Sequence, residues 1–147
     1  GGKLFQKEGF REMEKNKKFG EIGKAEFAKR SRNNYKYWKQ SSLDNAGFFV
    51  LFNGFLDNDI LKKISGNALK LYMFLGIKSD NFTGESHYSI KTMAKYFGKS
   101  ERTINNWISE LEKLNLIRRV QFQHNKVSHT FLQPYMAGRP RKGSEYE

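Results

Sequence analysis

Residues 89–104, with the sequence SIKTMAKYFGKSERTI, contain two short segments with helical spacing and a tight turn between them. Ser89 and Ser100 each precede one segment, and serine is a favoured helix N-cap because its hydroxyl accepts a backbone N–H bond. Gly98 tolerates the left-handed conformation that ends a helix. Ala94 is small enough for two helices to cross closely. Together these residues predict a helix-turn-helix.

Further elements are predicted on both sides of this motif. A helix is expected to begin near Ser65, because an apolar stripe follows at helical spacing: Ala68, Leu69, Leu71, Tyr72, Leu75 and Gly76. The helix after Ser100 continues to Asn115, with an apolar face of Ile104, Trp107, Ile108, Leu111 and Leu114. The runs 116–123 and 127–132 favour strands and have hairpin spacing. A very short strand is expected at His87-Tyr88.

The order helix, short strand, helix, turn, helix and hairpin predicts an α+β winged helix-turn-helix with a three-helix core and a C-terminal β-hairpin wing. This domain is expected to span residues 43–134. A leading strand is predicted at residues 48–52, which are rich in β-favouring residues, and a connector at residues 56–61. Residues 1–42 are expected to form a basic, partly helical or disordered extension, and residues 135–147 a flexible basic tail.

The region resembles bacterial winged helix-turn-helix domains of plasmid, phage and chromosomal regulators and of plasmid replication initiators. The similarity rests on three stretches of sequence: residues 69–75, residues 89–104 and residues 107–117. Many members have glycine between the last helix and the hairpin, where this chain has Asn115, which also tolerates a positive φ. The resemblance implies DNA binding, with the third helix in the major groove.

The third helix has a polar side opposite its apolar face. With 100° per residue and Ile104 as the origin, the apolar side chains fall within about 60° of one direction. The other side and its flanks carry the candidate base-contacting residues Arg102, Thr103, Asn105, Asn106 and Ser109, with Lys113 at the far end. Arginine can read guanine and asparagine can read adenine, each through two hydrogen bonds in the major groove.

A second set of residues is suited to holding the DNA backbone. Helix N-termini and lysine side chains bind phosphate groups. The candidate backbone and wing contacts are Ser89, Lys91, Lys95, Lys99, Ser100, Lys113 and Lys126. Lys126 lies at the tip of the predicted hairpin, within reach of an adjacent minor groove. Arg118 and Arg119 are expected to support the hairpin. For one of them, the alternative is an ion pair with Glu110 or Glu112.

The two ends of the chain leave alternatives open. The mixture of basic and aromatic residues at positions 30–39 favours a solvated, partly helical extension. The alternatives are a phosphate-contacting arm and a dimerisation segment. Near the other end, Gly138-Arg139-Pro140-Arg141 resembles the core of an AT-hook. That resemblance implies a tail in which Arg139 and Arg141 enter a narrow A·T minor groove, where the electrostatic potential is most negative.

The amino-acid composition limits the classes of protein to which this chain can belong. The 147 residues include 27 Lys and Arg against 15 Asp and Glu, a net charge of +12 that favours a polyanionic partner. There is no cysteine, which excludes disulfides and thiol-based zinc sites. No apolar run approaches the roughly 20 residues of a membrane span, and no export signal is evident. A cytoplasmic protein on bacterial nucleoid or plasmid DNA is expected.

Catalytic and metal chemistry find no support in the sequence. His87, His124 and His129 have no carboxylate or second histidine at ligand spacing, so no metal and no cofactor are predicted. The expected function is sequence-specific binding of double-stranded DNA, in transcriptional regulation or replication initiation, by a homodimer. Two alternatives are a winged-helix module that binds proteins and an RNA-binding module. The second predicts a preference for single strands or A-form helices.

Overall fold

The computed structural model describes residues 23–137, and the chain divides into two compact units, Gly1–Phe48 and Phe49–Glu147. In the first unit, helix α2 (Lys24–Ser41) continues into a π-helical turn, η1 (Ser42–Ala46). No side chain of α2 is buried, and Tyr35, Tyr37 and Trp38 are all exposed. Residues 1–22 of the predicted basic extension lie outside the described part of the chain.

The second unit begins with an extended segment where a leading strand was predicted. That prediction was wrong: residues 48–52 pair with no strand among residues 23–137. A strand pairs its backbone groups with a neighbouring strand, whereas this segment is held by side chains that pack onto helices. The ring centroids of Phe49 and Tyr72 are 6.3 Å apart, and those of Phe52 and Phe55 are 5.4 Å apart.

Two short helices follow where only a connector was expected, α3 (Gly54–Asp57) and α4 (Ile60–Lys63). They bury Phe55 and Ile60 and reverse direction at Asp59, which has a φ of 57°. Helix α5 (Gly66–Lys78) comes next, and the Ser65 hydroxyl accepts the Ala68 N–H at its start, as predicted. The buried face of α5 includes Tyr72, and burial raises the pKa of its hydroxyl to about 12.

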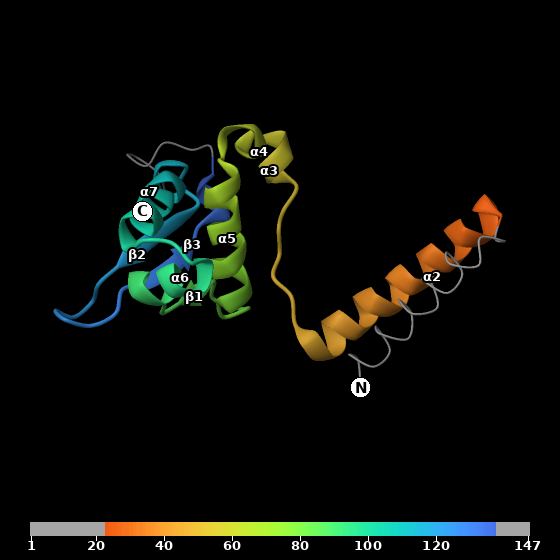
Figure 1. Cartoon of the computed structure of the whole chain (residues 1–147), viewed down its shortest axis with the longest axis horizontal. Helices are drawn as coiled ribbons and strands as arrows, with labels where there is room; N and C mark the ends of the chain where they lie inside the picture. Colours follow the sequence, from red (N-terminus) through yellow and green to blue (C-terminus); the bar gives the residue numbers. More distant parts are fainter. Residues whose placement is uncertain (1–22, 138–147) are drawn as a thin grey trace. The chain divides into compact units, whose positions relative to one another are not determined.

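The helix-turn-helix consists of α6 (Ile90–Phe97) and α7 (Glu101–Lys113), which pack against each other (Figure 1). Ser89 and Ser100 cap the two helices through bonds from the Thr92 and Thr103 N–H groups, each 3.1 Å long. Gly98 ends α6 with a φ of 65°, in the left-handed region. These three local predictions are therefore confirmed.

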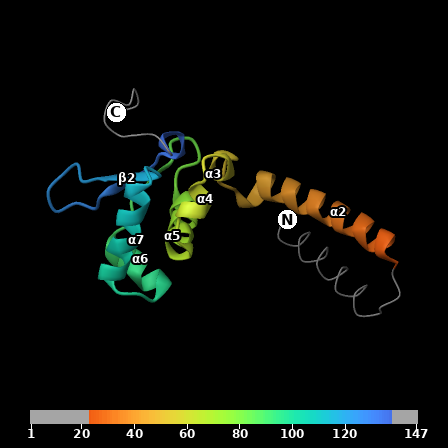
Figure 2. The ribbon, with the colours of Figure 1, turned by 90° about the horizontal axis from the view of Figure 1, so that it is seen from above.

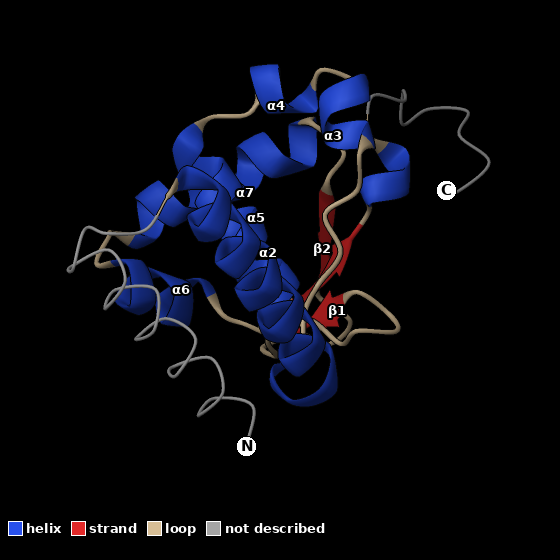
Figure 3. Ribbon diagram, turned by 90° about the vertical axis from the view of Figure 1, so that its right-hand side faces the viewer, coloured by secondary structure: helices blue, strands red, loops and turns tan. Residues whose placement is uncertain are grey.

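The wing belongs to a three-stranded antiparallel sheet of β1 (Glu85–Ser86), β2 (Ile117–Val120) and β3 (His129–Leu132), in the order β1-β3-β2. The first strand was predicted two residues too late, at His87-Tyr88, and the hairpin strands are shorter than expected. The strands lie beside α5 and α7 (Figure 3), and the loop between β2 and β3 extends away from the helices (Figure 2).

One hydrophobic core joins the three helices, the sheet and the segment after it. Its fully buried members include Leu71, Leu75, Met93, Ile104, Leu111, Leu116 and Ile117. Trp107 is also a core residue, as predicted. The tail was expected to begin at residue 135, but a 3-10 turn, η2 (Pro134–Met136), buries Met136, and Ala137 packs against the core. Among residues 23–137, no helix combines the length and apolar character needed to cross a bilayer.

Candidate nucleic-acid interface

Helix α7 presents a continuous polar surface on the side away from the core. Its apolar side is buried through Ile104, Trp107, Ile108 and Leu111. Five side chains on the opposite side are exposed and make no hydrogen bond or ion pair with any residue in the described part of the chain: Arg102, Asn105, Asn106, Ser109 and Lys113. Their donors and acceptors are therefore free to contact another molecule.

Thr103 differs from the other candidate base-contacting residues. Its side chain is partly buried on the flank of α7, and its hydroxyl accepts a 2.9 Å bond from the Ser100 hydroxyl. Ser89 and Thr92 form the same hydroxyl pair, 2.9 Å apart, at the start of α6. A Ser-x-x-Thr pair thus stabilises the start of each helix. The hydroxyls of Ser100 and Thr103 are already hydrogen bonded to each other in the cap of α7.

The candidate phosphate contacts are cationic and exposed. Lys91 and Lys95 lie on α6, Lys99 in the turn before α7, and Lys113 at the end of α7. Lys126 lies apart from them in the wing loop, where its carbonyl accepts a 2.8 Å bond from the Gln121 side chain. The φ of 64° at Asn125 reverses the chain beside it. These lysines are therefore distributed over α6, the turn, the end of α7 and the wing loop.

A comparison with protein families bears on this segment. Residues 62–117 match the family model described as a helix-turn-helix domain. This segment is a helix-turn-helix domain. Such domains are typically non-enzymatic and bind DNA, so the match suggests DNA as the partner. No curated protein and no solved structure matches the chain.

Arg119 and Arg118 have different roles in the helix-turn-helix domain. Arg119 is partly buried and donates to the Tyr88 carbonyl at 3.2 Å and to the Thr130 hydroxyl at 2.7 Å. Burial lowers the pKa of Arg119, while the nearby Glu112 carboxylate acts in the opposite direction. Arg119 therefore joins β2 to β3 and to the start of α6, as predicted for one arginine of the pair. Arg118 is exposed.

The expectation that no histidine has a carboxylate or a second histidine at ligand spacing was wrong. Glu85, His87 and His129 each offer one ligand atom, and the three atoms lie within 4.8 Å of one another. The residues are 44 positions apart at the extremes, so spacing along the chain could not reveal the cluster. His124 is not part of this cluster.

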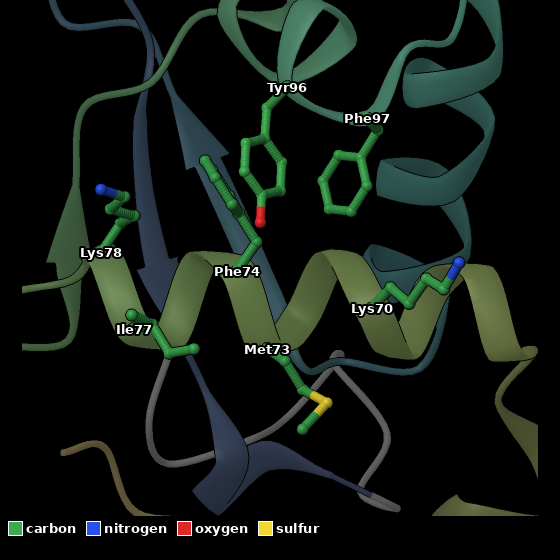
Figure 4. A pocket seen from close by; sticks show the side chains of 7 residues that line it. All are labelled: Lys70, Met73, Phe74, Ile77, Lys78, Tyr96 and Phe97. Carbon is green, nitrogen blue, oxygen red and sulfur yellow. The ribbon is translucent and has the colours of Figure 1, made fainter. Parts of the chain in front are cut away.

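A groove lies between α5 and α6 of the helix-turn-helix domain, on a surface separate from the polar side of α7. The Phe74 ring packs 4.9 Å from Tyr96 and 5.6 Å from Phe97, and these rings face one another in Figure 4. The other lining residues are Lys70, Met73, Ile77 and Lys78. Met73, Ile77 and Tyr96 are exposed, so the rim is apolar with a lysine near each end.

The predicted minor-groove tail lies outside the described residues. Arg139 and Arg141 belong to the segment 138–147 and contribute nothing to the geometry above. The other candidate residues lie on α7, on α6 and the turn after it, and in the wing loop.

Proposed function

We propose that this protein binds duplex DNA in a sequence-specific manner, with α7 in the major groove. This proposal rests on the exposed polar side of α7. Within residues 23–137, no partner occupies the guanidinium donors of Arg102 or the amide groups of Asn105 and Asn106. The exposed side of an ordinary solvated helix carries mainly Glu and Lys side chains, whereas this side of α7 carries mainly amide, hydroxyl and guanidinium groups. Major-groove edges are read by the amide and guanidinium groups found here.

Each part of the surface has a role in this proposal. Arg102 and the two asparagines contact base edges, and Ser109 contacts a base or an adjacent phosphate from the same side of α7. Thr103 orients the first turn through its bond to Ser100. Lys91, Lys95, Lys99 and Lys113 hold phosphates on both sides of the groove, together with the N–H groups at the starts of α6 and α7.

The wing and the tail extend this contact. Lys126 lies at the end of the β2–β3 loop and enters the neighbouring minor groove or contacts its phosphates. In this proposal Arg139 and Arg141 enter an adjacent A·T minor groove, which is supported by the resemblance of residues 138–141 to an AT-hook core. The protein acts as a homodimer on the nucleoid or on plasmid DNA in the bacterial cytoplasm, as a transcriptional regulator or as a replication initiator of a plasmid- or phage-type element.

Selection from a random duplex library tests the proposal directly. The full chain is expected to enrich one motif, and affinity for that motif is expected to fall with salt, since bound lysines displace counterions. A palindromic motif supports the homodimer. Equal retention of all sequences contradicts specificity, and failure to bind any duplex at low ionic strength contradicts DNA binding itself.

The apolar rim of the groove between α5 and α6 favours a second candidate function, a module that binds another protein. Met73, Ile77 and Tyr96 are exposed there, as such a contact requires. This function predicts no enriched motif in the selection. It also predicts that Ile77→Asp abolishes binding to the partner, whereas Arg102→Ala has no effect.

A further inference from the structure

The sheet places three metal-ligating side chains on one face of the wing base. In the β1–β3 pairing, Glu85 is opposite Phe131 and Ser86 is opposite Thr130. Continuing this antiparallel register by one residue brings His87 opposite His129. Alternate residues of a strand point to the same face, so Glu85 and His87 share the face on which His129 lies. Ser86 and Thr130, on the other face, are buried.

The side chains converge on that face. His129 Nδ1 is hydrogen bonded to Glu85 Oε2, and His87 Nδ1 lies 3.9 Å from the same oxygen. The two imidazole rings are 4.1 Å apart between centroids. Glu85 and His129 are partly buried, with about a quarter to a third of each side chain accessible, whereas His87 is 58% exposed. Two ligands are therefore held in place, and the third is free to turn.

The geometry points to a binding site for a divalent transition-metal ion of the Zn²⁺ type, held by Glu85, His87 and His129. Two imidazoles and one carboxylate are ligands that Zn²⁺ accepts, and three protein ligands leave one position for water. Ligand atoms around zinc lie about 3.3 Å apart when its bonds are about 2.0–2.1 Å long. The ligand atoms here lie within 4.8 Å of one another. They reach that spacing when the exposed His87 turns inward and when His129 Nδ1 and Glu85 Oε2 move apart, as the proton between them is released and the metal ion takes its place.

The surroundings support a bound ion. The Phe122 ring packs edge-on against the His129 ring at 4.9 Å between centroids, and the Phe131 ring, on the same face of the sheet, is stacked with it at 6.4 Å. These rings restrict the His129 imidazole and partly exclude water from it. A hollow beside the two histidines is lined by Phe122, Gln123, Lys126 and Val127. The Glu85 carboxylate, hydrogen bonded to His129, supplies the negative charge among the three ligands.

A bound ion would join β1 to the first residue of β3, directly below the wing loop. The β1 strand has two residues, and only two pairs of residues are in register between β1 and β3. A metal ion bound by residues of both segments would therefore add substantially to the contacts that hold β1 in place. Metal binding is therefore expected to stabilise the fold by mass action. This inference does not depend on DNA binding, and its test requires no DNA.

The experiment uses the full chain without a polyhistidine tag, after removal of metals with a chelator. Co²⁺ is titrated and followed by its visible ligand-field absorption, and Zn²⁺ is then added as a competitor. One Co²⁺ is expected per chain, and Zn²⁺ is expected to displace it. His87→Ala is expected to lower the affinity at least about tenfold, since loss even of a residue supporting a metal ligand has that effect.

His87→Ala is the decisive variant because this exposed side chain supports none of the core. Far-UV circular dichroism confirms its fold, and His129→Ala and Glu85→Gln should show losses of affinity in the same direction. His124→Ala is the matched control, since it removes an imidazole from the wing loop, outside the cluster. Zn²⁺ should raise Tm in the wild type and in His124→Ala only. The inference is overturned if the wild type shows no visible bands, if His87→Ala binds Co²⁺ as the wild type does, or if His124→Ala loses as much affinity.

Discussion

The Glu110 carboxylate in α7 accepts two hydrogen bonds from Ser65, which caps α5 from 45 positions earlier in the chain. The Ser65 N–H donates to Oε2 at 2.6 Å, and the Ser65 hydroxyl donates to Oε1 at 2.8 Å. The same hydroxyl accepts the Ala68 N–H. A capping box usually takes its carboxylate from the same helix, whereas here the carboxylate comes from α7 and fixes the start of α5 against it.

Replacing Glu110 with alanine is therefore expected to reduce stability. The substitution leaves the Ser65 N–H without this acceptor, and we expect a loss of about 1–2 kcal/mol in the free energy of unfolding. Urea denaturation measures it. Ser109→Ala, at the neighbouring exposed position, should leave the midpoint unchanged, and equal effects of the two substitutions would argue against the role given to Glu110.

Arg119 is expected to be structural rather than DNA-binding. Arg119→Met removes the donors to the Tyr88 carbonyl and the Thr130 hydroxyl, and Thr130 is fully buried. We expect a loss of about 1–3 kcal/mol, because a buried hydroxyl and a carbonyl lose a charged partner. Arg118→Met is the control and should keep the wild-type Tm. A destabilised Arg118→Met with an unaffected Arg119→Met would reverse the assignment.

Close packing of Phe49 against Gly76 makes this glycine sensitive to substitution. A Cβ at Gly76 would lie 2.5 Å from atoms of the Phe49 ring. Gly76→Ala should therefore cost about 1–3 kcal/mol, despite the better helix propensity of alanine. Gly66→Ala, in the first turn of the same helix with open space around it, should not destabilise. In Phe49→Ala, the additional Gly76→Ala change should cost nothing, which a double-mutant cycle measures.

The loop after α5 should contribute a pH-dependent stability through Asp80. Its carboxylate accepts the N–H groups of Phe82 and Thr83, at 2.8 and 3.0 Å, and these bonds lower the pKa of Asp80. A carboxyl whose pKa is lower in the folded state stabilises the fold above its ordinary pKa, and this contribution is lost as the pH falls through the folded value. The difference in unfolding free energy between wild type and Asp80→Ala should be constant above the ordinary value of 3.8 and should shrink below it. A difference independent of pH would contradict this account.

Two exposed cations should differ in their effect on DNA binding. Arg102→Ala is expected to weaken the selected motif by about 1–3 kcal/mol and to relax preference at one base pair. Lys95→Ala should weaken all duplexes alike and reduce the salt slope by about one. Titrations of the selected and scrambled duplexes at several salt concentrations measure both effects. Uniform weakening by Arg102→Ala, with altered preference in Lys95→Ala, would exchange the two roles.

Local signals in the sequence predicted most of the helix-turn-helix domain. Ser65, Ser89 and Ser100 each cap the helix expected after them, and Gly98 and Asn115 both adopt a positive φ. Such signals are visible in sequence because a cap and its N–H partner lie three residues apart. The apolar face of α7 was predicted for the same reason, since helical periodicity repeats within four residues.

Features that depend on distant partners were not predicted. The β-favouring residues 48–52 gave no sign that Phe49 and Phe52 pack onto helices instead of joining the sheet. The bonds between Glu110 and Ser65 and the Glu85, His87 and His129 cluster each join residues more than 40 positions apart. The cluster depends on the register of β1 against β3. Only a prediction of that register would have brought the two histidines together.

Because β3 is the central strand of the sheet, insertions in the β2–β3 loop and insertions in β1 have different effects on the structure. The loop of residues 121–128 lies beyond the last paired residues, Val120 and His129, so homologous chains can vary its length without altering the pairs below it. One residue inserted between Gly84 and Ser86 has the opposite effect, because a shift by one turns every following side chain of that strand to the other face. A lengthened wing is thus compatible with this architecture, whereas a lengthened first strand would point the imidazole of His87 inward and Ser86 outward.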